Sequence, residues 1–301
     1  MTKYYSNGKL LITAEYLVLD GAEALALPTT LGQSLQIESN KEQKIKWTSL
    51  DYKNLPWLDT AFHFENSNLI CEDKNDLTKR LAEILNTAKT LNPEFLKDNK
   101  GYAITTKLGF PQNWGLGTSS TLINNVASWA KVNPYTLLEL TFGGSGYDIA
   151  CASNNSPITF KLQEETPAVT PVVFNPDFKD QLYFVHLNEK QNSRDGIAAY
   201  RKNTKDKRHT ITKINEITGN IISCDSIDDF NSLINEHENI ISEIIQLTPV
   251  KSRLFPDFQG SIKSLGAWGG DFILVSAKNN PTPYFKNKGY NTILRYDDMI
   301  L

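Results

Sequence analysis

A short run of glycine and hydroxyl residues, Gly115-Leu116-Gly117-Thr118-Ser119-Ser120, separates two segments of different pattern. The alternating apolar run 101–108 predicts a strand, and the pattern over 118–131 predicts a helix. Backbone N–H groups in such a loop can bind an anion, and the helix dipole adds positive charge. A glycine turn with Thr118 as the helix cap explains the same residues. The stretch therefore indicates either a phosphate-binding loop or an ordinary helix start.

The loop belongs to neither common phosphate-binding motif. It has no lysine at the position that G-x-x-x-x-G-K-[ST] requires, and Ser120 stands where G-x-G-x-x-G has its third glycine. A phosphate site built on this loop must therefore be completed by residues elsewhere in the chain.

Composition restricts the classes of protein. The chain has 301 residues, 40% hydrophobic and 22% charged, with a formal net charge of −3. These values are ordinary for a globular protein and do not favour nucleic acid or an anionic membrane surface as partner. We find no apolar run of membrane-spanning length and no secretory signal, and Cys71, Cys151 and Cys224 lack disulfide or zinc-site spacing. The expected location is the cytoplasm.

The elements around the loop suggest two domains. Strand-like runs occur at 10–12 and 17–19, and residues 39–75 are the hardest to assign. After about residue 175 the order becomes strand, helices, two strands, helix and strand, which an α+β sandwich of ferredoxin-like type needs. We therefore predict an α+β protein with domains at 1–175 and 176–301.

Three stretches, in this order, resemble the motifs of the GHMP superfamily of small-molecule kinases, which includes galactokinase and homoserine, mevalonate and phosphomevalonate kinases. Gly8-Lys9-Leu10-Leu11-Ile12-Thr13-Ala14-Glu15-Tyr16 resembles the first motif, with Ala14 for the usual glycine. Residues 111–120 resemble P-x-x-x-G-L-G-S-S-A, with Thr118 and Ser120 as departures. Gly266-Ala267-Trp268-Gly269-Gly270-Asp271 resembles the third motif, with Trp268 where glycine is usual.

The resemblance covers nearly the whole chain and implies the two-domain GHMP kinase fold. Its N-terminal domain is similar to domain 2 of ribosomal protein S5, and its C-terminal domain is a ferredoxin-like α/β sandwich. The implied activity is phosphoryl transfer from ATP, with Mg²⁺, to a small-molecule substrate. Tyr16 and Asp271 resemble phosphomevalonate kinase more than mevalonate kinase, so we expect an acceptor of the mevalonate route. We expect a monomer or homodimer.

The resemblance also implies catalytic residues. Asp148, in Ser145-Gly146-Tyr147-Asp148, matches the active-site aspartate, which would orient the acceptor hydroxyl and accept its proton. Lys9 matches the first-motif lysine, whose ammonium would offset developing negative charge. The alternatives are an aspartate that caps a helix and a lysine at a strand edge.

Binding residues follow in the same way. The nucleotide phosphates would lie on the loop, with Asn113 and Trp114 at its mouth, and Ser119 would bind magnesium. Glu139 could be the second magnesium ligand or a surface residue. The substrate site would be completed by a further set of residues: Glu15, Tyr16, Arg194, Gly269 and Gly270. Arg194 could equally be a solvated arginine at a helix start, and Trp268 either fills a pocket wall or narrows the substrate site.

Two other functions remain open. One is a sugar or homoserine-type kinase of the same superfamily. The other is a catalytically inactive member that binds a ligand or partner, which the departures Ala14, Thr118 and Trp268 motivate. Retention of Lys9 and Asp148 favours an enzyme.

Overall fold

The computed structural model describes residues 1–301 except 67, 72, 74, 99, 165, 191–192 and 203–204, and gives only the backbone of 193–195 and 199. The chain divides into two compact units that interleave along the sequence. Unit 1 comprises Met1–Gly8, Leu31–Gln112 and Leu116–Ser153. Unit 2 comprises Lys9–Thr30, Asn113–Gly115 and Asn154–Leu301.

Unit 1 is built on a sheet in which the strand order is β5-β4-β3-β6-β2, with β1 also paired to β2. β3 and β6 are parallel, whereas β3–β4, β4–β5 and β2–β6 are antiparallel. The predicted strand at 101–108 is confirmed as β6, and the unassigned region 39–75 supplies β3, β4 and β5. The strands are β1 (Thr2–Leu11), β2 (Ala24–Asn40), β3 (Lys44–Leu50), β4 (Pro56–Glu65), β5 (Asn68–Cys71) and β6 (Gly101–Leu108).

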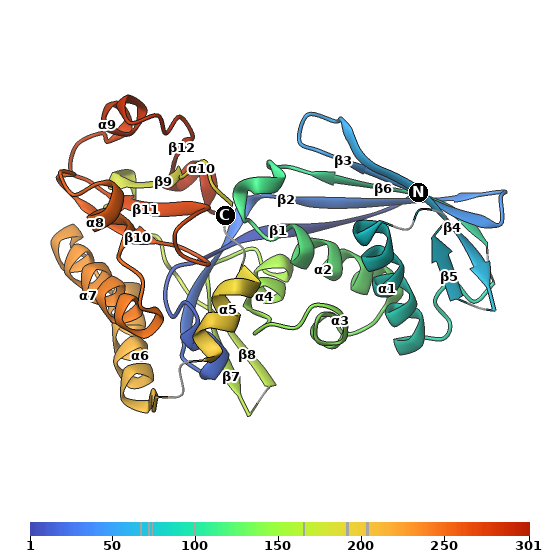
Figure 1. The fold of residues 1–301 in the computed structure, drawn as a ribbon, viewed down its shortest axis with the longest axis horizontal. Helices are drawn as coiled ribbons and strands as arrows, with labels where there is room; N and C mark the ends of the chain where they lie inside the picture. The colour runs from blue at the N-terminus through green and yellow to red at the C-terminus, as the bar shows by residue number, and fades with distance from the viewer. Residues whose placement is uncertain are drawn as a thin grey trace. The chain divides into compact units, whose positions relative to one another are not determined.

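Helices cover one face of this sheet, as Figure 1 shows for α1, α2 and α3. Trp47, Phe62 and Ile104 from the strands pack with Leu85 and Ile123 from the helices in one buried cluster. Burial of this apolar surface is the main force that holds the helices on the sheet. The helices are α1 (Asp76–Leu91), α2 (Thr118–Ala130), α3 (Pro134–Thr141) and α4 (Tyr147–Ser153).

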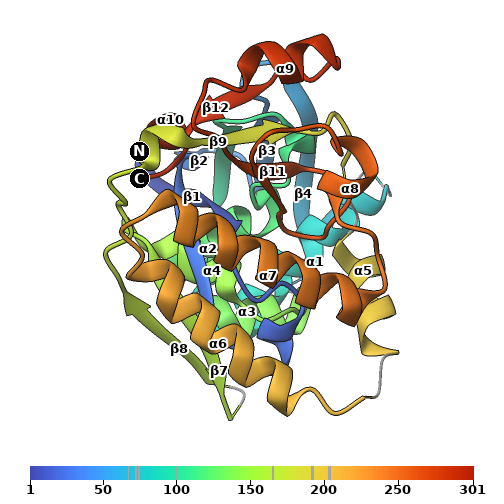
Figure 2. The same cartoon turned by 90° about the vertical axis from the view of Figure 1, so that its left-hand side faces the viewer.

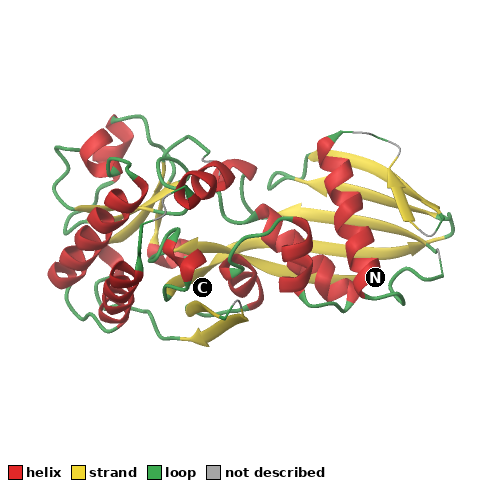
Figure 3. Ribbon diagram, turned by 60° about the horizontal axis from the view of Figure 1, so that its bottom comes forward, coloured by secondary structure: helices red, strands yellow, loops and turns green. Residues whose placement is uncertain are grey.

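Unit 2 contains a second, antiparallel sheet of order β10-β11-β9-β12. Figure 2 shows α6 and α7 side by side, and Figure 3 distinguishes these helices from the strands by colour. The elements are β7 (Ile158–Gln163), β8 (Thr166–Pro171), β9 (Leu182–His186), α5 (Ser193–Arg201), α6 (Arg208–Ile222), α7 (Ile227–Ile245), α8 (Val250–Leu254), β10 (Ser261–Ser264), β11 (Phe272–Ser276), α9 (Thr282–Asn287), β12 (Ile293–Arg295) and α10 (Tyr296–Met299), with 3-10 turns η1 (Leu17–Asp20), η2 (Gln112–Trp114) and η3 (Lys179–Gln181).

The long strand β2 runs through both units. Its residues Gln33–Asn40 pair with β6 in unit 1, and Ala24, Leu25 and Ala26 pair with β7 in unit 2. The combination of a large sheet, a second small sheet and covering helices confirms the predicted α+β class. No described helix is long and apolar enough to cross a membrane.

The predicted strand at 17–19 is wrong, because these residues form η1. The run is apolar since Leu17 and Val18 are buried, and burial alone does not select a strand. Ala14 and Tyr16 have positive φ, which lets the Leu17 and Val18 N–H groups bond back to Glu15 and Ala14 carbonyls. The backbone therefore closes into a tight turn.

Candidate active site

Helix α2 begins differently from α1, α3 and α7. Asn75, Asn133 and Ser226 cap those three helices by accepting first-turn N–H groups. The N-cap of α2 is Gly117, at φ 92° and ψ 44°, and the described residues give it no side-chain cap. Thr118 is therefore the first helical residue and not the cap. The uncapped N–H groups at this end are the arrangement that favours an anion.

The hydroxyl groups of the loop divide into two kinds. Ser120 is buried, and its hydroxyl donates to the Gly117 carbonyl at 3.0 Å. Thr121 Oγ1 lies 2.9 Å from the same carbonyl and 2.8 Å from Gln33 Oε1. Ser119 is exposed, and no hydrogen bond from its hydroxyl is found within the described part of the chain. The Ser119 hydroxyl is thus open to solvent, while Ser120 and Thr121 hold the loop's shape.

Asp148 lies in the first turn of α4, directly after a loop in which Gly143, Gly144 and Gly146 have positive φ. Its side chain is half-buried, and Oδ1 accepts the Ile149 N–H at 3.0 Å. Asp148 is the second residue of α4 and this bond comes from the next residue, so it is not the N-cap hydrogen bond of the alternative role. Burial, Cys151 and Asp148 together raise the pKa of Tyr135 to about 12, so this α3 residue stays a neutral phenol beside the carboxylate.

In unit 2, the start of the loop 115–120 lies against the third glycine stretch. A Cβ added to Gly115 would lie 2.4 Å from the Asp271 carboxylate carbon, so Asp271 directly contacts the first loop glycine. The Trp114 ring packs edge-on to Phe272, with centroids 5.3 Å apart. His186 Nε2 lies 3.1 Å from the Asn113 carbonyl oxygen. Residues of the second and third motifs are thus in contact within one unit.

The first motif reaches the same glycine turn from another direction. Tyr16 Oη donates to the Ala267 carbonyl oxygen at 2.7 Å. The Tyr16 ring stacks on Tyr200, which donates to Asp20 at 2.6 Å. A Cβ at Gly196 would lie 2.2 Å from Tyr16 Oη, so α5 can approach this closely only with glycine there. Tyr16 is a buried support of the turn.

Ala14 and Trp268 stand where the first and third motifs usually have glycine, and both keep a backbone conformation that favours glycine. Ala14 has φ 65° and Trp268 has φ 58°, and the neighbours Tyr16 and Asp271 are also at positive φ, 63° and 53°. Such conformations are costly for residues with a Cβ and gather at functional sites. Trp268 is only 1% exposed, so its ring is buried in the protein interior.

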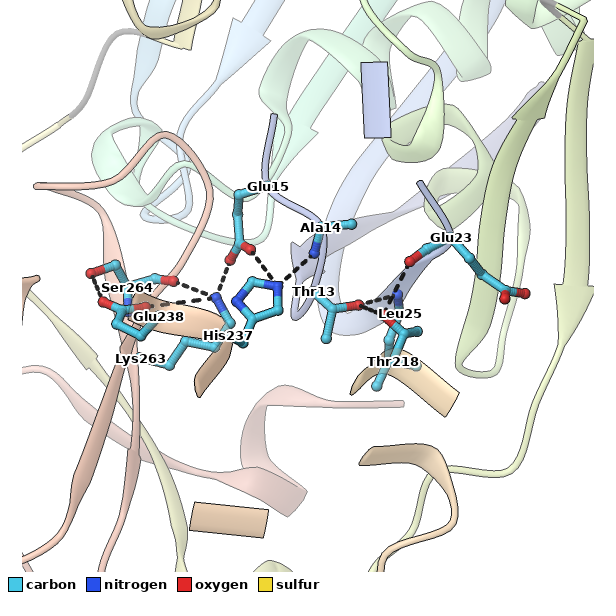
Figure 4. Close-up of polar contacts among 10 residues, drawn as sticks. All are labelled: Thr13, Ala14, Glu15, Glu23, Leu25, Thr218, His237, Glu238, Lys263 and Ser264. Carbon is cyan, nitrogen blue, oxygen red and sulfur yellow. Dashed lines mark hydrogen bonds and ion pairs between the residues drawn. The ribbon is translucent and has the colours of Figure 1, made fainter. Parts of the chain in front are cut away.

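A buried polar network joins the first motif to β10 and α7 (Figure 4). Lys263 Nζ bonds to Glu15 Oε1 and lies 4.0 Å from Glu238 Oε2. Glu238 Oε1 accepts the Ser264 hydroxyl at 2.5 Å and the Ser264 N–H at 3.0 Å. His237 Nε2 accepts the Ala14 N–H at 2.9 Å. Lys263 and Ser264 lie immediately before the glycine turn, so the network fixes its starting point.

The network contains more carboxylate than ammonium, and water does not reach it. Burial raises the pKa of Glu15 to about 7, although Lys263 opposes the shift, and burial also raises the pKa of Glu238. Burial and the Lys263 charge hold the pKa of His237 well below its usual range. Since Nε2 accepts a hydrogen bond, neutral His237 carries its proton on Nδ1. Glu15 Oε2 and His237 Nδ1 have no hydrogen-bond partner among the described atoms.

The remaining predicted residues have varied positions. Lys9 is half-buried in β1, and Glu139 is exposed on α3. The side chain of Arg194, at the start of α5, lies outside the described residues. Across the described residues, no group of three or more His, Cys, Asp or Glu side chains could hold a metal.

Sequence reasoning missed the buried residues Lys263, His237 and Glu238. Lys263 offered one signal, since it is a lysine in a short strand pattern that leads directly into the third motif. His237 and Glu238 lie on a helix far from any motif in sequence, and only their burial reveals them.

No protein-family model matches the chain, and no curated protein matches it. Solved structures do. Methanococcus jannaschii mevalonate kinase is 14% identical with a TM-score of 0.71, over 97% of this chain and 96% of that one. Streptococcus pneumoniae phosphomevalonate kinase, in complex with phosphomevalonate and AMPPNP, is 15% identical with a TM-score of 0.69, over 98% and 100%. Lactococcus lactis galactokinase, complexed with galactose, is 13% identical with a TM-score of 0.68, over 97% and 92%. The chain has the two-domain fold of the GHMP kinases.

Proposed function

We propose that this protein is an ATP-dependent small-molecule kinase of the GHMP superfamily. The observation that carries the proposal is the meeting of three motif segments at one strained turn. Tyr16 bonds to Ala267, Asp271 lies against Gly115, and Trp268 holds a left-handed backbone between them. A fold needs no such convergence of strained backbone for stability alone.

The loop 115–120 binds the ATP phosphates in this proposal, through N–H groups at the uncapped start of α2. Asp148 orients the acceptor hydroxyl and accepts its proton, and Lys9 stabilises negative charge at the transferred group. Mg²⁺ would be held by the exposed Ser119 hydroxyl, with Glu139 as second ligand, and would neutralise phosphate charge.

The acceptor we favour is mevalonate or phosphomevalonate. Structures with this fold include kinases named for both compounds, and Tyr16 and Asp271 match the phosphomevalonate kinase pattern better. A sugar kinase is the second candidate, since galactokinase and a heptose 1-phosphate kinase share the fold.

Release of ADP from ATP and Mg²⁺ tests the proposal directly, with mevalonate, phosphomevalonate, homoserine and common sugars as acceptors. One of them should support turnover. Asp148→Asn should reduce kcat by roughly 10²- to 10⁴-fold because it removes the base. An asparagine oxygen can still accept the Ile149 N–H, so the melting temperature should hardly change. A large loss of stability with little loss of kcat would instead identify Asp148 as a structural cap.

A catalytically inactive ligand-binding protein is the remaining alternative. Its motivation was the replacement of motif residues, but Ala14 and Trp268 both keep the positive φ that glycine would adopt. ATP binding measured by calorimetry without turnover of any acceptor would favour this alternative.

A further inference from the structure

Arg253 lies at the glycine turn although no motif contains it. It is an exposed residue of α8, and its Nη2 donates to the Gly269 carbonyl oxygen at 3.3 Å. Gly269 has φ 90°, and a Cβ built there would lie 3.6 Å from Nη2. The guanidinium therefore rests against bare backbone of the turn.

The guanidinium has no acidic partner in the described chain, where Arg80 and Arg208 each have one. Arg80 pairs with Glu83 at 2.7 Å and Arg208 with Asp206 at 2.6 Å. Asp257, four residues after Arg253 and beyond the end of α8, accepts hydrogen bonds from Tyr284 and Lys288 instead. An arginine has five N–H donors in a planar fork, and the Gly269 bond uses one of them. The remaining donors suit the two oxygens of a carboxylate or phosphate.

The turn that Arg253 contacts is strained and is anchored by buried hydrogen bonds. Lys263 and Ser264 fix its start in the buried network, and Tyr16 bonds to its Ala267 carbonyl. An arginine bonded to such a turn is held in place before any ligand arrives, which lowers the entropy cost of binding.

We propose that Arg253 binds the anionic group, carboxylate or phosphate, of the small molecule that receives the phosphoryl group. This inference rests on the proposed function and assigns its substrate class: an acid or a phosphate ester and not a neutral sugar. In this assignment the loop at α2 binds the ATP phosphates and Arg253 binds the acceptor.

Kinetics of Arg253→Gln test the assignment. The KM of the anionic acceptor should rise roughly 10- to 100-fold, as expected when a charge-assisted hydrogen bond is lost, while the KM of ATP stays within about twofold. Arg253→Lys should recover part of the loss because it keeps the charge without the fork. Arg208→Gln is the matched control, an exposed arginine whose charge is already paired, and should leave both constants unchanged.

The second part of the experiment varies the chemical form of the acceptor. Mevalonate and homoserine present a carboxylate, phosphomevalonate adds a phosphate, and galactose is neutral. Methyl esterification of the carboxylate should raise the wild-type KM and leave that of Arg253→Gln unchanged if the carboxylate is the group bound. If esterification affects both proteins equally while phosphomevalonate alone depends on Arg253, the phosphate is the group.

Calorimetric titration of the same compounds without ATP separates this inference from the proposed function. An anionic compound that binds the wild type and binds Arg253→Gln more weakly supports the inference even where no ADP is released. The absence of ADP release would refute only the proposed kinase activity. The inference is overturned if Arg253→Gln binds every acceptor with the affinity of the wild type. It is also overturned if the substitution lowers the affinity for ATP instead, or if no anionic compound binds the wild type.

Discussion

The two glycine-rich stretches of this protein are held in shape by different forces. The loop 115–120 depends on neutral hydrogen bonds, in which Ser120 and Thr121 return to the Gly117 carbonyl and Thr121 also lies within hydrogen-bond distance of Gln33. The turn 266–271 depends on charged groups distant in sequence, chiefly the buried pair Glu15–Lys263.

The difference follows from what each segment must do. The loop runs directly into α2, and helix formation supplies most of its geometry. The turn carries a tryptophan and an aspartate at positive φ, a conformation that persists only where the surroundings enforce it. Buried ion pairs with fixed geometry provide that enforcement, at the cost of removing charges from water.

Loss of Lys263 should be the most damaging of the changes to either segment. Lys263→Met leaves Glu15 buried without a counter-ion and should lower the free energy of unfolding by about 3–5 kcal/mol, measured by urea denaturation at a pH above 7, where Glu15 of the wild type is ionised. Lys278→Met removes the exposed pair with Asp228 and should cost less than about 1 kcal/mol. The double variant Glu15→Leu/Lys263→Met should regain much of the loss. Equal effects of the Lys263 and Lys278 substitutions would contradict the contrast between the two stretches.

Glu15 should give the turn a pH dependence that the loop lacks. Its pKa is raised from 4.5 to about 7 on folding, so the folded state holds a proton that the unfolded state releases. The resulting stability is complete below pH 4.5 and is lost as the pH rises through 7, by roughly 3 kcal/mol in total. The lowered pKa of His237 has the opposite effect: it makes the folded state less stable as the pH falls below 6.5. The comparison with Glu15→Gln isolates the Glu15 contribution.

The measurement is the free energy of unfolding of wild type and Glu15→Gln between pH 4.5 and 8. The free energy of unfolding of the wild type minus that of the variant should fall steadily across pH 4.5–7 and then stay constant. A difference that stays flat, or rises with pH, would show that Glu15 is ionised throughout.

Changes in the loop should have the smallest effect. Thr121→Val removes the hydroxyl that lies between Gln33 and the Gly117 carbonyl, and should lower the free energy of unfolding by about 1–2 kcal/mol because Gln33 is buried. Thr212→Val, at an exposed helical hydroxyl, is the control and should change it by less than about 0.5 kcal/mol. A loss as large as that of Lys263→Met would show that a neutral contact supports the loop as strongly as the buried charges support the turn.

Sequence reasoning located the motif residues well and their supports poorly. The strand 101–108 and the helix beginning at Thr118 were readable because hydrophobic periodicity is local. The run 17–19 was misread because its apolar character reflects burial, whereas its shape depends on positive φ at Ala14 and Tyr16. The role of Thr118 could not be decided either, since capping depends on φ and ψ at Gly117.

By itself, the sequence determined the order of three motifs and the α+β class, since both follow from residue type and local pattern. The candidate catalytic residues came from the resemblance of these motifs to a known family. Only the tertiary structure brought Glu15 to Lys263 across 248 positions and buried them with Glu238. It also placed Arg253 on the Gly269 carbonyl. Such contacts depend on the packing of α7, α8 and β10 around the first motif, and no local pattern in the chain encodes them.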